Sequence, residues 1–191
     1  MGLAAGSVIA WWLPAAALDW QPEAALAQPW RLVTAAWVHW SPLHLGANLA
    51  AAVVVAALGC AARLPAAAAL AWALAWPLTH AGLWAQPALA RYGGASGVLH
   101  AAVAVAACWL VATRRGPARG VGGAIAAGLA AKVLLEQPWR GPLAHAAGWD
   151  IAVAPWAHAS GALAGVAGAL MVAGLSGWMS RPGWRGQSRD G

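Results

Sequence analysis

The sequence alternates between long apolar runs and short breaks rich in arginine or proline, and this alternation constrains the fold more than any other feature. The chain of 191 residues is 62% hydrophobic and only 8% charged, whereas a soluble domain is about 25% charged. At about 20 residues per membrane-spanning helix, this length holds roughly six or seven spans joined by short loops. The composition therefore predicts an all-α, polytopic membrane protein embedded in a lipid bilayer.

We expect six transmembrane helices in a single membrane domain, residues 1–180, followed by a polar cytoplasmic tail, residues 181–191. The first helix is expected over the apolar run 2–18, which lacks the basic start of a secretory signal peptide and is interpreted as a retained helix. The later helices are expected at about 41–62, from beyond Pro65 to 84, and at 94–112, 121–135 and 151–175.

The distribution of arginines predicts the orientation of the chain. One side carries Arg63, Arg114, Arg115, Arg119, Arg181, Arg185 and Arg189, and the other carries Arg31, Arg91 and Arg140. By the positive-inside rule, both termini are expected in the cytoplasm. The arginines fall between apolar runs and form no patch interleaved with aromatics, so no nucleic-acid partner is expected. The two cysteines lack the spacing of metal ligands, and no metal is expected either.

Polar side chains inside apolar spans are costly and by default mark a functional site. His44 and Asn48 are four residues apart near the start of the second expected helix, so they share one helix face. Ser96 opens the fourth expected helix between Gly94 and Gly97, in the motif Gly-Ala-Ser-Gly. These glycines let a neighbouring backbone or a substrate approach the serine closely.

The third polar cluster is His158 near the start of the sixth expected helix, followed by Gly161. Under the expected topology, His44, Ser96 and His158 each lie within about two turns of the outer end of their helices, in one layer. A serine, a histidine that activates it and donors aimed at an oxyanion are what acyl transfer requires.

These clusters resemble, in order, the pattern of the rhomboid family of intramembrane serine proteases, over about residues 31–168. The resemblance implies a six-helix rhomboid-like bundle without metal or cofactor. It implies Ser96 as nucleophile, His158 as general base, and His44 and Asn48 with the Ser96 amide as the oxyanion hole. The implied catalytic pair is a dyad without a carboxylate. The implied activity is cleavage of a transmembrane protein substrate.

His100 stands one turn below Ser96, where the family often has a tyrosine that packs on the catalytic histidine. This difference and the compact body resemble the rhombosortase subgroup. The subgroup implies cleavage of a C-terminal GlyGly-type transmembrane sorting tag of exported proteins, at the periplasmic face of a bacterial inner membrane. His100 is then expected to orient or stack on His158, with Gly94, Gly97 and Gly161 packed around the site.

Other interpretations remain open at this point. A catalytically inactive rhomboid-like protein would bind membrane clients without cutting them, a membrane haem protein would use the six histidines as axial ligands, and a transporter ranks last. Lys132 and Glu136 are four residues apart and are expected to form an ion pair. Asp150 lies eight residues before His158 and is left out of the catalytic set.

Overall fold

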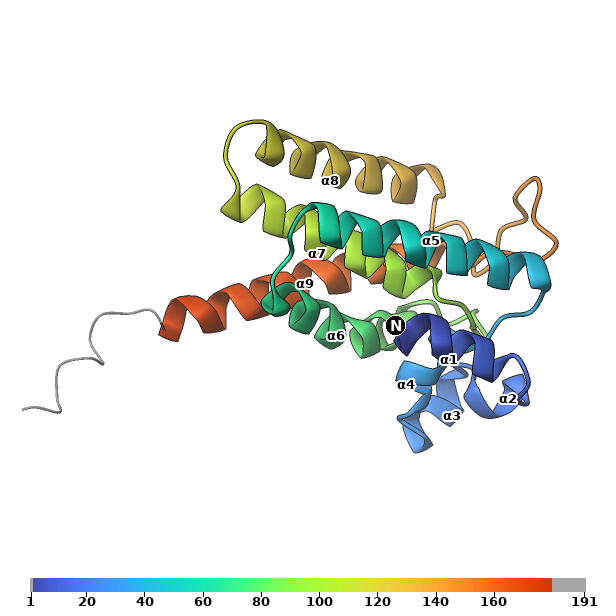
Figure 1. Ribbon diagram of the computed structural model, residues 1–191. Coiled ribbons are helices and arrows are strands. Elements are labelled where there is room, and N and C mark those ends of the chain that lie inside the picture. The colour runs from blue at the N-terminus through green and yellow to red at the C-terminus, as the bar shows by residue number, and fades with distance from the viewer. Residues whose placement is uncertain (1, 180–191) are drawn as a thin grey trace, which may run out of the picture.

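The computed structural model describes residues 2–179, and within them five helices are long and apolar enough to cross a bilayer (Figure 1). The protein is therefore a multi-pass membrane protein. The five helices are α5 (Pro42–Ala61), α6 (Ala66–Ala81, continued by the 3-10 helix η2, Gly82–Ala85), α7 (Ser96–Thr113), α8 (Pro117–Leu135) and α9 (Pro155–Met179).

Local signals explain where these helices begin. Pro42 and Pro117 stand in the first turns of α5 and α8, where a missing N–H costs nothing. The Ser41 side chain accepts a hydrogen bond from the His44 N–H and so caps α5. The helices predicted beyond residue 40 are confirmed, with shifts of a few residues at their ends.

The helix predicted over residues 2–18 is wrong, because the structure breaks it into α1 (Gly2–Ala10) and α2 (Ala15–Leu18). A turn at 11–13 precedes Pro14, which has no N–H for a continuous helix. The nine residues of α1 are about 14 Å long, less than half of a bilayer core. The five candidate spans found within residues 2–179 therefore do not include the predicted sixth one. The cytoplasmic termini stay a prediction, and the predicted tail 181–191 lies outside the described residues.

Between α2 and α5 the chain forms the short elements α3 (Pro22–Ala27), α4 (Arg31–Thr34) and the 3-10 helix η1 (Ala35–Trp37), which cluster at one end of the bundle (Figure 1). The buried Asp19 carboxylate ties this region together, because it pairs with Arg31 at 3.2 Å and with Arg91 at 2.8 Å. Trp20 and Tyr92 exchange two backbone hydrogen bonds. The N-terminal region is thereby attached to the loop that precedes α7.

The helix α7 is central: 56% of its span is buried, against 6% for α8. It packs closely on α9, which also contacts α6 (Figure 1). A Cβ atom on Gly161 would collide with the Gly97 carbonyl, and one on Gly165 would collide with the Ala101 carbonyl. The two backbones are in direct contact, as small residues permit in membrane helices. This contact places the start of α9 beside the start of α7.

We expect Gly161→Ala to destabilise the protein by about 1–3 kcal/mol or more, because the added methyl group meets backbone that has no alternative rotamer. Thermal unfolding in detergent measures this loss. Gly174→Ala on the same helix is the matched control, since a Cβ there has nothing within 4 Å. Equal melting temperatures of the two variants would contradict the proposed role of the close α7–α9 contact.

Candidate active site

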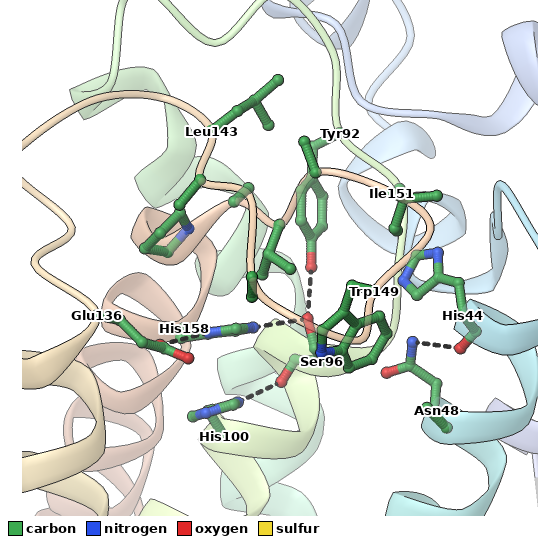
Figure 2. Close-up of a pocket in the computed structure, with 18 of the residues that line it drawn as sticks. His44, Asn48, Tyr92, Ser96, His100, Glu136, Leu143, Trp149, Ile151 and His158 are labelled. Atoms are coloured by element: carbon green, nitrogen blue, oxygen red, sulfur yellow. Dashed lines mark hydrogen bonds and ion pairs between the residues drawn. The ribbon is translucent and has the colours of Figure 1, made fainter.

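Polar side chains from four helices meet at one end of the bundle. His44, Ser96 and His158 lie in the first turns of α5, α7 and α9. Glu136 follows the last residue of α8, which runs in the opposite direction. All four line one cavity of about 610 Å³ (Figure 2). The structure therefore brings together the three polar clusters of the sequence.

A chain of hydrogen bonds runs from the serine through the histidine to a carboxylate (Figure 2). His158 Nε2 lies 3.0 Å from Ser96 Oγ, and His158 Nδ1 lies 2.7 Å from Glu136 Oε2. An ionised carboxylate only accepts hydrogen bonds, so Nδ1 carries the proton and donates it to Glu136. This leaves Nε2 as the acceptor for the Ser96 hydroxyl. That tautomer is the one in which a histidine removes a proton from serine.

The expected dyad without a carboxylate differs from this arrangement, because Glu136 directly contacts His158. The predicted ion pair between Lys132 and Glu136 is confirmed, but it accounts for only one oxygen of the carboxylate. Asp150 is elsewhere, and its Oδ1 accepts a hydrogen bond from Ser41 at 2.8 Å. The sequence signal for Glu136 was its place at the end of the fifth expected helix, which under the expected topology lies at the same depth as Ser96.

The Glu136 carboxyl is strongly acidic. Burial alone would raise its pKa, but the hydrogen bonds and charges of His158 and Lys132 outweigh burial and lower the pKa from 4.5 to about 2. A lowered pKa means that the folded state favours the ionised form. Glu136 is therefore a carboxylate at all ordinary pH values.

This shift predicts a pH-dependent contribution to stability. Because the folded pKa is below the unfolded one, the contribution is fully present above pH 4.5 and disappears as the pH falls to about 2. We expect wild type to have a higher melting temperature than Glu136→Gln at neutral pH. The difference should vanish as the pH falls from 4.5 to about 2. Melting curves in detergent at a series of pH values measure it. A difference that is constant down to about pH 2 would contradict the assignment.

His100 lies directly against His158 (Figure 2). The rings of His100 and His158 stack with centroids 4.2 Å apart and planes inclined by 11°. His100 Nδ1 donates a hydrogen bond to the Ser96 carbonyl at 2.7 Å, one helical turn earlier. This bond fixes the plane of the His100 ring. His100 therefore supports one face of the His158 ring.

The arrangement of His44 suits it to donate a hydrogen bond into the cavity. The Trp40 backbone N–H lies 3.4 Å from His44 Nδ1, which makes Nδ1 the acceptor and places the proton on Nε2. A Cβ atom on Gly94 would stand 2.8 Å from that Nε2, and the φ of +140° at Gly94 is one that other residues rarely adopt. Glycine is thus required beside His44 both for space and for backbone conformation.

Two more donors border the cavity. Asn48 Nδ2 donates to the His44 carbonyl at 3.0 Å, which leaves its second N–H available. Ser96 is the first residue of α7, so its backbone N–H has no acceptor within the helix. The positive end of the helix dipole adds to the attraction for an anion there.

Tyr92 is a site residue to which the sequence pattern assigned no role. Its hydroxyl donates to the Gly94 carbonyl at 3.0 Å and lies 3.4 Å from Ser96 Oγ (Figure 2). Burial is the largest effect on the phenol and raises its pKa, so Tyr92 stays protonated. The sequence shows that Tyr92 shortly precedes the glycine-serine motif. Only the fold of the loop brings its hydroxyl close to Ser96.

The loop between α8 and α9 borders the cavity with Leu143, Trp149 and Ile151. Ala144 and Val153 exchange two backbone hydrogen bonds that close the loop on itself. The Trp149 and His44 rings are nearly perpendicular, with an interplanar angle of 76° and centroids 6.4 Å apart. The loop therefore contributes apolar walls to a site whose base is polar.

The remaining histidines lie outside the residues that line the cavity. His80 is fully buried in α6 and donates through Nδ1 to the Leu32 carbonyl at 2.6 Å. His145 is exposed on the loop before α9. His39 packs on His44 at 4.7 Å, where burial lowers the pKa of His39 against the opposing effect of its bond to the Trp37 carbonyl.

Residues 26–175 match the family model described as Rhomboid domain. The match covers most of the chain and includes α5 to α8, nearly all of α9, and every residue that lines the cavity. No curated protein and no solved structure matches the chain.

Proposed function

The chain belongs to the rhomboid family of intramembrane serine proteases, and we propose that it is itself an active serine endopeptidase with Ser96 as nucleophile and His158 as general base. The observation that carries the proposal is the 3.0 Å contact between Ser96 Oγ and His158 Nε2 inside a cavity. An inactive client-binding relative needs neither of these residues nor their contact. The geometry therefore favours catalysis over client binding alone.

In the proposed reaction, Ser96 Oγ attacks the carbonyl carbon of the scissile bond while His158 Nε2 takes the hydroxyl proton. The carbonyl oxygen becomes an anion, which the N–H donors of His44, Asn48 and the Ser96 backbone stabilise. When the C–N bond breaks, His158 returns the proton to the leaving amine. A water molecule activated by His158 then hydrolyses the acyl-enzyme.

The proposed substrate is a transmembrane protein cut near the outer face of the bilayer. More narrowly, we propose that it is an exported protein with a C-terminal GlyGly-type transmembrane sorting tag, in the inner membrane of a Gram-negative bacterium. The support for this narrower class is His100, which replaces a tyrosine of the general family pattern and stacks on His158. Small residues before a scissile bond would also enter a cavity walled by Leu143, Trp149 and Ile151.

Ser96→Ala and His158→Ala are expected to remove cleavage of a C-terminally anchored reporter in membranes. Asn48→Ala is expected to reduce the rate about 10²- to 10³-fold, because it removes one of several oxyanion donors. His145→Ala, which changes an exposed histidine, is the control and should cleave like wild type. Undiminished cleavage by a folded Ser96→Ala protein would refute the nucleophile. A folded wild type that cuts no anchored reporter would favour the client-binding alternative.

The narrower substrate class predicts a preference between two matched reporters. One reporter carries GlyGly before its transmembrane anchor and basic tail, and the other carries ValVal at the same positions. We expect wild type to cleave the GlyGly reporter at least tenfold faster, because β-branched side chains meet the apolar walls of the cavity. Equal cleavage rates for the two reporters in the same membranes would contradict the sorting-tag role. They would be consistent with a general rhomboid protease.

A further inference from the structure

We infer that Glu136 is the positioning residue of a Ser96–His158–Glu136 triad, where a serine-histidine dyad is expected. The inference rests on the proposed function, because it assigns Glu136 a part in activating Ser96. Its basis is the contact of 2.7 Å between Glu136 Oε2 and His158 Nδ1. Both ring nitrogens of His158 are thus engaged, one by the carboxylate and the other by the serine hydroxyl.

The contact determines which nitrogen of His158 carries its proton. A neutral imidazole has two tautomers, and only the one protonated at Nδ1 can accept the serine proton at Nε2. The His158 side chain is only 6% exposed, so water competes poorly for Nδ1. The carboxylate of Glu136 therefore selects the competent tautomer and holds the ring in the plane that points Nε2 at Ser96.

The carboxylate is held by two partners on its two oxygens. Lys132 bonds Oε1 from one helical turn earlier on α8, and His158 bonds Oε2. The Lys132 side chain is half exposed, whereas that of Glu136 is 28% exposed. Lys132 thereby fixes the Glu136 rotamer without occupying the oxygen that faces His158.

The position of Glu136 is unfavourable for its own helix. It caps the C-terminal end of α8, where the helix dipole is negative and a carboxylate is destabilising. A residue that breaks a local preference is expected at sites where another interaction matters more. Here that interaction joins α8 to His158 on α9. Because α8 is otherwise little buried, the orientation of His158 depends on the position of α8.

In the reaction, the carboxylate changes no bonds. The Ser96 proton moves to His158 Nε2, and the resulting imidazolium keeps its Nδ1 proton in the hydrogen bond to Glu136. Glu136 stays ionised and stabilises the positive charge on the ring. When the amine leaves, the Nε2 proton goes to it and the ring returns to its starting tautomer.

The test measures the reactivity of Ser96 with a fluorophosphonate probe, which needs no protein substrate. The purified full chain in detergent is compared with Glu136→Gln, Glu136→Asp and the matched control Glu23→Gln, whose carboxylate is exposed on α3. We expect Glu136→Gln to lower the maximal phosphonylation rate about 10²- to 10⁴-fold with unchanged probe affinity. Glu136→Asp should react at least tenfold faster than Glu136→Gln. Glu23→Gln should react at the wild-type rate.

A second measurement reports the hydrogen bond directly. Proton NMR of Ser96→Ala, labelled with ¹⁵N-histidine, should show a far-downfield Nδ1 proton that is lost in the double variant with Glu136→Gln. The same resonance should remain in the double variant with Glu23→Gln. The probe affinity from the kinetic comparison separates positioning from a general loss of folding, since a misfolded Glu136→Gln protein would lose that affinity as well.

The outcomes separate this inference from the proposed function. If wild type reacts with the probe but cuts no anchored protein, the proposed proteolysis fails and the labelling ratio still decides the role of Glu136. If Glu136→Gln reacts at the wild-type rate, or loses only probe affinity, the triad is overturned while proteolysis stands. If wild type does not react at all, both are overturned, because there is then no activated serine for Glu136 to support.

Discussion

The direct backbone contact between α7 and α9 is the constraint on which the rest of the site depends. Gly161 lies against the Gly97 carbonyl and Gly165 against the Ala101 carbonyl, which brings the two helix axes closer than side chains would allow. Ser96 directly precedes Gly97, and His158 lies three residues before Gly161. Their separation of 3.0 Å therefore follows from backbone packing. A lipid environment favours such close helix packing, because membrane helices gain little from excluding water and much from van der Waals contact.

The second requirement is to keep charges paired at the end of the bundle where the site lies. Asp19 binds Arg31 and Arg91 on the side of the N-terminal region, and Glu136 binds Lys132 and His158 on the opposite side. A buried charge without a partner would cost several kcal/mol. Each network also joins segments that are far apart in sequence. Charge pairing therefore both satisfies the carboxylates and holds the walls of the cavity in place.

The sequence predicted five spans well, because apolar runs of about 20 residues bounded by proline have few alternatives in a membrane protein. It failed for residues 2–37, where α3 and α4 have six residues or fewer and no periodicity long enough to detect. These short helices exist because Arg31 reaches the Asp19 carbonyl and carboxylate, and Thr34 reaches the Leu18 carbonyl. Such contacts between turns have no signature in composition. Pro14 in the sequence indicated a break in the first predicted helix, but the apolar run around it favoured a continuous helix.

By itself, the sequence determined that His44, Ser96 and His158 begin three spans and so lie at one depth, because depth follows from counting residues along a helix. Only the tertiary structure decided which carboxylate meets His158. Glu136 and Asp150 both flank the loop before α9, and either is plausible by distance along the chain. The choice depends on the rotation of α8 about its axis and on the folding of the loop, which ties Asp150 to Ser41 instead. A span that is apolar on every face encodes its depth but not its rotation, so packing against α7 and α9 had to supply that information.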